Sequence, residues 1–246
     1  MPLGHVYPYL NLQMLYGKHL GLRGLVSGLF AEGDARALEL REVVEGLQRE
    51  SAAQGWLRPQ AIYQWFRARA AGDAVRVLSP AGEEVARFVF PRQPDGERLC
   101  LADYVREDAG DYLALFAVTC GAGVRERAQE WKERGEYLRS HALQALAIEC
   151  AEALAEMLHG RLRDHWGFPD PPEVPLAEKL KGRYQGIRVS FGYPACPNLA
   201  DQEILWRLLR PERIGLTLTE GFMMDPEASV SALVFHHPAA KYFKAG

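Results

Sequence analysis

The sequence has no excess of positive charge, because its 29 Lys and Arg are outnumbered by 32 Asp and Glu, giving a formal net charge of −3. Such a chain cannot neutralise many phosphates, so we expect no nucleic-acid partner. No apolar run approaches the roughly 20 residues of a membrane span. The first ten residues, MPLGHVYPYL, also lack the charged and apolar regions of a secretory signal. We therefore expect a cytoplasmic protein without a membrane partner.

Closely spaced metal or redox ligands are also missing. No two of the four cysteines form a C-x-x-C pair, which argues against a zinc ribbon and a thioredoxin-like centre. Among the seven scattered histidines only His236 and His237 are adjacent, and neighbours in an extended segment point to opposite faces. We expect buried, reduced thiols at all four cysteines: Cys100, Cys120, Cys150 and Cys196.

General enzyme signatures are missing as well, including the Rossmann glycine pattern, the P-loop, H-E-x-x-H and G-x-S-x-G. The nearest approach to a phosphate-binding loop is Gly121-Ala122-Gly123. It lacks a third glycine and a later acidic residue, so it predicts a simple strand-to-helix turn.

What is present is the composition of a globular protein, with 48% hydrophobic and 25% charged residues, in a chain long enough for a substantial core. Residues 1–80 are predicted to be helical, with short connections. Apolar runs on either side of Ser79–Gly82 then indicate a β-hairpin at 75–90, and a buried strand follows at 112–118. Residues 124–166 predict helix with an interruption at Gly135, and one apolar stripe toward a core.

The last third alternates between short strands and one helix. Strands are predicted at 184–190, 214–219 and 230–235, with a proline-restricted turn at 192–197 and a helix capped by Asn198. Helices followed by closely spaced strands favour an α+β fold with a largely antiparallel sheet over regular βαβ alternation.

One segment carries more specific information. Residues 184–197, YQGIRVSFGYPACP, closely resemble the R-x-x-x-G-Y stretch of the activation domain of cobalamin-dependent methionine synthase. Further similar blocks follow the family's order from about residue 57 to the end, whereas the helical segment 1–56 resembles it least. These blocks are LADYV at 101–105, ALFAVT at 114–119, AEALAEMLH at 151–159, LTE at 218–220, ASVS at 228–231, His237-Pro238 and KYF at 241–243.

The resemblance implies a helmet-like single domain over residues 1–246, with a twisted antiparallel sheet flanked by helices. Such domains bind S-adenosylmethionine over the cobalamin of a neighbouring domain. They support reductive methylation of cob(II)alamin to methylcobalamin, with electrons from flavodoxin or an equivalent donor. A sulfonium methyl needs alignment with cobalt more than acid–base catalysis, so a missing catalytic triad is compatible with this role.

The chain would then be one part of methionine synthase, a methyltransferase. It contains no homocysteine-, folate- or cobalamin-binding module, so we expect either an excised fragment or a separately encoded reactivation partner.

The resemblance also implies ligand-binding residues in the motif segment. Arg188 matches the motif arginine and is expected to fix the ligand through its backbone and its charged side chain. Ser190, Gly192 and Tyr193 follow, with Gly192 allowing the backbone to approach the ligand closely. The plainer alternatives are a surface strand arginine and a tyrosine packed in the core.

Four further positions lie outside this segment. Tyr242 and Phe243 match an aromatic pair whose second member is often Tyr, and an aromatic face near a sulfonium adds cation–π stabilisation of about 1 kcal/mol. Glu152 matches a ligand-facing glutamate, but helical geometry also permits a solvated position away from the apolar stripe. Where the family has an Asp for the ligand's amino group this chain has His5, so Glu220 is an alternative carboxylate.

Two other functions stay open from the sequence. One is a module that caps cobalamin or docks flavodoxin but has lost S-adenosylmethionine binding, which the substitution at His5 favours. The other is a conventional methyltransferase on a Rossmann sheet, which the missing glycine loop and the predicted hairpin disfavour.

Overall fold

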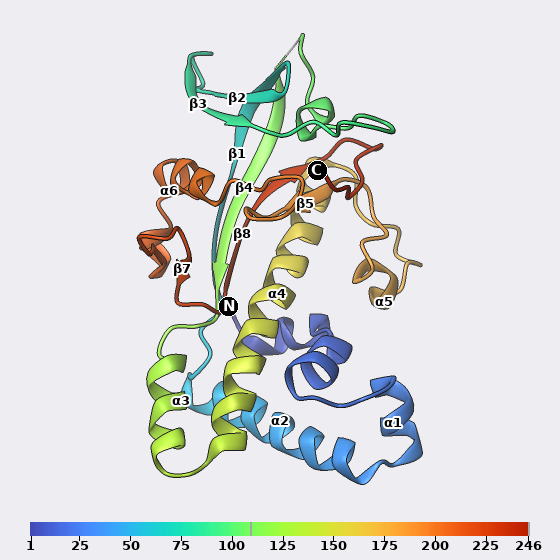
Figure 1. The fold of residues 1–246 in the computed structure, drawn as a ribbon, viewed down its shortest axis with the longest axis vertical. Coiled ribbons are helices and arrows are strands. Elements are labelled where there is room, and N and C mark those ends of the chain that lie inside the picture. Colours follow the sequence, from blue (N-terminus) through green and yellow to red (C-terminus); the bar gives the residue numbers. More distant parts are fainter. Residues whose placement is uncertain (109, 246) are drawn as a thin grey trace. The chain divides into compact units, whose positions relative to one another are not determined.

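A computed structural model describes residues 1–108 and 110–245, and the chain divides into two compact units (Figure 1). The first unit comprises Met1–Gln60, Val118–Met157 and Asp225–Val230. The second comprises Ala61–Ala117, Leu158–Met224 and Ser231–Gly246. Each unit is described by itself below.

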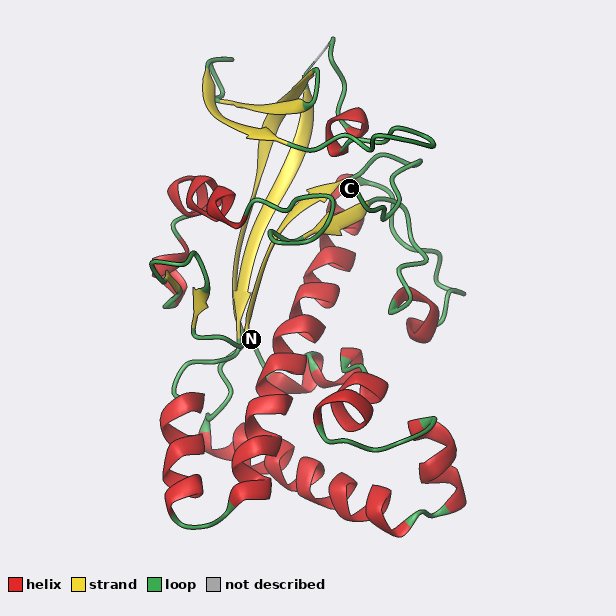
Figure 2. Ribbon diagram, viewed as in Figure 1, coloured by secondary structure: helices red, strands yellow, loops and turns green. Residues whose placement is uncertain are grey.

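The first unit is mainly helical (Figure 2). Its α2 helix begins at Asp34, whose Oδ1 accepts a hydrogen bond from the amide of Ala37 at 2.8 Å, and ends before Gly55. A break at Gly135 separates α3 from α4, as the sequence predicted. Its helices are η1 (Leu3–His5), η2 (Tyr7–Tyr9), η3 (Gln13–His19), α1 (Val26–Glu32), α2 (Ala35–Gln54), α3 (Val124–Glu133) and most of α4 (Tyr137–Trp166).

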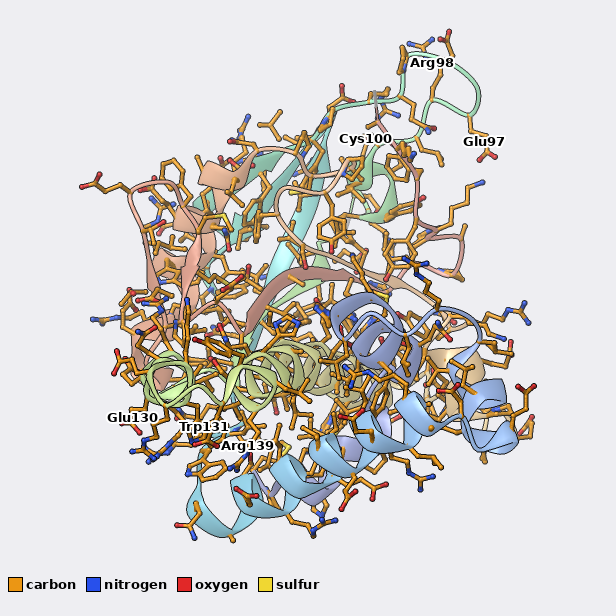
Figure 3. All side chains as sticks on the ribbon, turned by 60° about the horizontal axis from the view of Figure 1, so that its bottom comes forward. Glu97, Arg98, Cys100, Glu130, Trp131 and Arg139 are labelled. Atoms are coloured by element: carbon orange, nitrogen blue, oxygen red, sulfur yellow. The ribbon has the colours of Figure 1, made fainter. Side chains whose placement is uncertain are left out.

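Aromatic and cationic side chains stabilise the junction of α3 and α4. The buried ring of Trp131 packs edge-on against Trp56, with 5.2 Å between ring centroids. The Arg139 guanidinium lies 4.4 Å from the centroid of the Trp131 ring, a cation–π contact (Figure 3). Arg139 also pairs with Glu50 of α2 and with Glu136 in the loop before α4, so it ties α4 to α2 and, through Trp131, to α3.

The α4 helix is buried more completely than the predicted single stripe. All five stripe residues are buried, but so are Ala147, Ala151 and Ala153 beside the stripe and Ala145 on the opposite face. Small alanine side chains let neighbouring segments approach on several sides, so the helix is enclosed and does not lie on the surface. The stripe residues are Leu143, Leu146, Cys150, Leu154 and Met157.

Antiparallel pairing dominates the second unit (Figure 2). The six-stranded sheet has the order β3-β2-β1-β4-β8-β5, and the β1–β2, β2–β3 and β5–β8 pairs are antiparallel. This confirms the α+β class and excludes the Rossmann alternative. The strands are β1 (Gln60–Ala71), β2 (Ala74–Leu78), β3 (Glu84–Val89), β4 (Asp111–Thr119), β5 (Ile187–Val189) and β8 (Ser229–Phe235).

Short elements complete the chain. A separate two-stranded sheet pairs β6 (Thr217–Leu218) with β7 (Met224–Asp225). The remaining helices are η4 (Leu101–Tyr104), α5 (Leu176–Lys179), η5 (Leu199–Asp201), α6 (Gln202–Leu209) and η6 (Pro211–Ile214). Within the described ranges, no helix is long and apolar enough to cross a membrane.

The prediction of helix throughout residues 1–80 is wrong for β1. Its Gln, Arg and Ala content favours helix locally. However, Ala68 and Ala70 pair with Val77 and Val75 of β2, and all four side chains are buried in the core of the second unit. This long-range pairing overrides the local preference.

The remaining strand and turn predictions are largely confirmed. The hairpin of β2 and β3 forms around residues 79–83, and β4 and β8 occupy the predicted positions. Asn198 begins the predicted helical segment, accepting a hydrogen bond from the amide of Ala200 at 3.3 Å. Two strands are shorter than predicted: β5 has three residues, and Ile214 ends a 3-10 turn before the two-residue β6.

All four cysteines are buried, as predicted. Burial raises the pKa of Cys120 and that of Cys196 to about 12, so both are thiols at neutral pH.

Candidate functional site

Arg188 occupies the middle of β5. Its Cα lies opposite that of Val234 in β8, whereas Ile187 and Val189 belong to the hydrophobic core of the second unit. Since successive side chains of a strand point to opposite faces, Arg188 lies on the face away from this core. The side chain is half-buried, and its contact with a ligand stays a prediction.

A tight backbone crossing fixes the start of β5. Gly186 has φ +78°, in the left-handed region. A Cβ atom at this position would lie 2.4 Å from the carbonyl oxygen of Phe235 in β8. Only glycine fits such an approach, so the backbone that leads to Arg188 is closely determined.

The segment after β5 forms a tight turn with an exposed aromatic side chain. The Gly192 amide donates to the Cys196 carbonyl, and the Cys196 amide donates to the Tyr193 carbonyl, both at 2.8 Å. Gly192 has φ +84°, and Ser190 just before it is half-buried. The Tyr193 side chain is 60% exposed, so the alternative of a core-packed tyrosine is wrong.

The two carboxy-terminal aromatic residues take different positions. Tyr242 is 55% exposed, and its hydroxyl oxygen lies 3.5 Å from that of Tyr184, which begins the motif segment. Phe243 is half-buried and packs edge-on against Tyr104, with 6.4 Å between ring centroids. Of this pair, Tyr242 is therefore the residue available to a ligand from solvent.

A neighbouring loop holds the carboxy-terminal segment in place. The Lys241 Nζ donates to both carboxylate oxygens of Glu97 at 2.7 and 2.6 Å. The Gln93 side-chain amide donates to the Lys244 carbonyl at 2.7 Å. Tyr104 adds the ring contact with Phe243, so the position of Tyr242 depends on residues about 140 positions earlier in the chain.

Buried polar residues that sequence reasoning missed lie at the end of α4. Arg163 is 2% exposed and forms a bidentate ion pair with Asp170, with nitrogen–oxygen distances of 2.7 and 2.6 Å. The carbon of its guanidinium lies 4.0 Å from the centroid of the Tyr184 ring. Burial opposes ionisation of Asp170, but hydrogen bonding and the charge of Arg163 still hold its pKa below the ordinary value.

His159 lies one turn before Arg163 and is fully buried. Its ring packs edge-on against Tyr184, with 4.9 Å between centroids. Burial, then the positive charges of Arg163 and Arg188, lower the pKa of His159 well below its usual range, so the ring is neutral at physiological pH. The last turns of α4 lie near β5, the strand that carries Arg188 (Figure 1). The sequence signal for this residue was its place at the end of the family-like block at 151–159.

The other predicted residues lie elsewhere. His5 is exposed at the end of η1 and Glu152 lies on α4, both in the first unit. Glu152 is half-buried, and its contact with a ligand stays a prediction. The contact predicted for His5 stays a prediction too. Glu220 is exposed in the turn between β6 and β7.

A cavity of about 210 Å³ in the first unit is not lined by any of the predicted residues. It is smaller than ordinary small-molecule pockets, which measure roughly 300–1,000 Å³. His19 and His141 line it, but His19 already bonds Glu149 and His141 bonds the His19 carbonyl. Among the described residues, no group of three or more His, Cys, Asp or Glu side chains is placed to hold a metal ion.

The second unit therefore contains a half-buried guanidinium at Arg188, two exposed phenol rings at Tyr193 and Tyr242, and a tight turn at Gly192. Arg188 can donate charged hydrogen bonds, and Tyr193 and Tyr242 offer aromatic faces to a planar or cationic group. This arrangement suits the binding and orientation of a polar ligand.

Comparison with known proteins gives consistent results. The family model "Vitamin B12 dependent methionine synthase, activation domain" matches residues 3–246. Methionine synthases of Mycobacterium leprae and Mycobacterium tuberculosis are 36% and 37% identical to the chain over 199 and 198 residues. These matches cover 74% of the chain but only 16% and 17% of the mycobacterial proteins.

A solved structure is similar over the whole chain. The crystal structure of the MetH reactivation domain bound to AdoHcy superposes with a TM-score of 0.94 and 28% sequence identity, covering 100% of this chain and 79% of the other. The sequence motif, the fold and the full-length family match agree, so this chain belongs to the family of activation domains of vitamin B12-dependent methionine synthase.

Proposed function

We propose that residues 1–246 form one module that binds S-adenosylmethionine and supports reactivation of cobalamin-dependent methionine synthase. In this role it assists reductive methylation of cob(II)alamin to methylcobalamin, with electrons from flavodoxin or an equivalent donor. The cobalamin is carried by another domain or chain, and a cytoplasmic setting is part of the proposal.

The observation that carries the proposal is the match to a reactivation domain bound to AdoHcy, at 28% identity over the full length of this chain. AdoHcy is S-adenosylmethionine without its transferable methyl group. A site that accepts one therefore needs little change to accept the other.

The residues of the second unit fit such a ligand. The Arg188 guanidinium suits a carboxylate or the nucleotide end, and the edge of β5 offers main-chain groups to an adenine. The Gly192 turn lets the backbone approach the ligand, and the exposed rings of Tyr193 and Tyr242 suit a sulfonium or a heterocycle. When bound, S-adenosylmethionine supplies an activated methyl group, and the chain's own residues orient it.

A second function, a docking module without S-adenosylmethionine binding, is favoured by one observation. His5 occupies the position where the family commonly has an acid for the ligand's amino group, and it is exposed. Protonated imidazole repels an ammonium group, so the loss of that contact weakens recognition.

Isothermal titration calorimetry with S-adenosylmethionine and with S-adenosylhomocysteine distinguishes the two functions. We expect heat from both ligands with the wild type, and none with Arg188→Ala. Arg69→Ala is a matched control, because Arg69 is also a strand arginine of the second unit but is exposed. Ligand at about 100 times Kd stabilises by about 2.7 kcal/mol, which raises Tm by roughly 5–10 °C at this size.

A folded wild type that gives no heat and no rise in Tm with either ligand would contradict the proposal and favour the docking module. Association with an isolated cobalamin domain would then support the docking role.

A further inference from the structure

A row of arginines crosses three neighbouring strands of the second unit. Arg69 of β1 lies directly opposite Arg76 of β2, and Arg76 lies directly opposite Arg87 of β3. The residues on either side of each arginine are buried in the core, so all three side chains lie on the face of the sheet away from it. Arg67 lies on the same face, two residues before Arg69. These four residues form what we call the arginine face, and the row across the strands spans about 10 Å.

The arrangement is unfavourable for the folded chain by itself. Like charges directly opposite each other on adjacent strands repel. Arg67 and Arg69 are exposed, and neither has a carboxylate partner within residues 1–108 and 110–245. A glutamate or a threonine at position 69 would remove the repulsion from Arg76, so the fold does not require an arginine there.

One carboxylate of the chain already binds at the other end of the row. The Nε and Nη2 atoms of Arg87 donate to the two carboxylate oxygens of Glu84 at 2.9 and 3.1 Å, and Nε of Arg76 donates to Glu84 as well. Hydrogen bonds from Arg87 and then Arg76 lower the pKa of Glu84 to about 2. This contact illustrates how the row binds a carboxylate, while Arg67 and Arg69 stay uncompensated.

Apolar and aromatic side chains border the arginines on the same face. Val89 lies two residues after Arg87 on β3 and is 62% exposed. Along β1, Tyr63 and Trp65 precede Arg67 with the same strand alternation, and their rings pack edge-on with 5.5 Å between centroids. Arginine, tyrosine and tryptophan are the residues enriched at the energetic centres of protein–protein interfaces.

We propose that the arginine face docks a partner protein that presents clustered Asp and Glu side chains. Charge complementarity selects this partner, because four arginines and Glu84 give the face four positive charges and one negative charge. The whole chain has a net charge of −3, which repels a long polyanion, and a row of about 10 Å suits a compact carboxylate cluster better than a nucleic-acid backbone. None of these residues belongs to the proposed S-adenosylmethionine site, so the inference does not depend on ligand binding.

Fluorescence anisotropy with a short, labelled poly-L-glutamate tests this surface. An oligothymidylate of the same length is the comparison probe, because both polymers carry about one negative charge per unit. We expect poly-L-glutamate to bind the wild type. Its affinity should fall about tenfold or more as NaCl rises from roughly 50 to 300 mM, since salt screens attraction at an exposed surface.

Arg69→Glu is the principal variant. It converts the repulsive pair with Arg76 into an attractive one, so we expect Tm equal to or above that of the wild type. Affinity for poly-L-glutamate should nevertheless fall about tenfold. Arg213→Glu is the matched control with the same change in net charge. Arg213 is exposed in η6, which packs through Ile214 against the core on the opposite face of the sheet, so affinity should stay within about twofold of the wild type.

Arg69→Thr removes the charge and keeps a strand-forming residue, so it decides the test if Arg69→Glu does not fold. We expect it to bind about threefold more weakly than the wild type with an unchanged Tm. Both Arg69 variants should retain the wild-type Kd for S-adenosylmethionine in calorimetry. A wild type that binds poly-L-glutamate but not S-adenosylmethionine would refute only the proposed function.

Three results would overturn the inference: no binding of poly-L-glutamate to the wild type, equal losses of affinity in Arg69→Glu and Arg213→Glu, or a loss of affinity in the Arg69 variants that is matched by a fall in Tm. Oligothymidylate binding more than about tenfold tighter than poly-L-glutamate would also overturn it, by indicating a nucleic acid in place of an acidic protein.

Discussion

Gly186 offers a sharp test of how β5 is built. We expect Gly186→Ala to destabilise the protein far more than the same change at Gly72. Both residues have positive φ, +78° and +61°, so both substitutions incur the left-handed penalty of about 1–2 kcal/mol for a residue with a Cβ. At Gly72 the new Cβ meets nothing within 4 Å. At Gly186 it would lie 2.4 Å from a backbone oxygen of Phe235.

The difference between the two variants isolates the steric contribution. A backbone carbonyl in a sheet cannot rotate away as a flexible side chain can, so β5 must separate from β8 or the strand must shift. Overpacking of this kind typically costs about 1–3 kcal/mol beyond the conformational penalty. At roughly 2–4 °C per kcal/mol for a chain of this size, Gly72→Ala should lower Tm by about 2–8 °C. Gly186→Ala should lower it by a further 2–12 °C or so.

Thermal unfolding followed by circular dichroism gives Tm, and calorimetry with S-adenosylmethionine gives Kd for the same variants. Because Arg188 lies two residues after Gly186, we also expect ligand affinity to fall in Gly186→Ala and to be unchanged in Gly72→Ala. Equal Tm values for the two variants would refute the close approach between Gly186 and Phe235.

Two further predictions concern buried ionisable groups. Because Asp170 has a lowered pKa in the folded state, its ion pair contributes stability that is present above the unfolded pKa of about 3.9 and is lost as pH falls through the folded value. Asp170→Asn should therefore lower stability at pH 7 by about 3–5 kcal/mol, since it leaves Arg163 buried without its anion. Urea unfolding should show a smaller loss at pH 3 than at pH 7. Equal losses at both pH values would contradict this origin. Four cysteines are buried: Cys100, Cys120, Cys150 and Cys196. Their thiols should not react with Ellman's reagent at pH 8 until the protein is unfolded in guanidinium. Rapid reaction of more than one thiol in the folded protein would contradict their burial.

Local sequence patterns predicted those parts of the fold in which local preference and tertiary structure agree. The hairpin of β2 and β3, the break at Gly135 and the cap at Asn198 each depend on a few neighbouring residues, and all three are confirmed. In β1 the alanines and arginines favour helix, and only pairing with β2 makes the segment a strand. Such pairing cannot be inferred from the segment alone.

The site shows the same limit. The motif predicted Arg188, Gly192 and Tyr193 because they are close in sequence. The burial of His159 and Arg163 beside this site could not be predicted from the sequence. A helical sequence does not show which of its polar residues are buried without hydrogen-bond partners.

The position of β5 at the end of the strand order has one more consequence. In an antiparallel edge strand, every second residue directs its amide and carbonyl away from the neighbouring strand, and such edges are prone to recruit strands from other molecules. The β5 strand is too short to recruit a strand from another molecule, because it has only three residues and is followed by the Gly192 turn, Pro194 and Pro197. We therefore expect this edge to resist aggregation while its outward main-chain groups remain accessible to something as small as a purine.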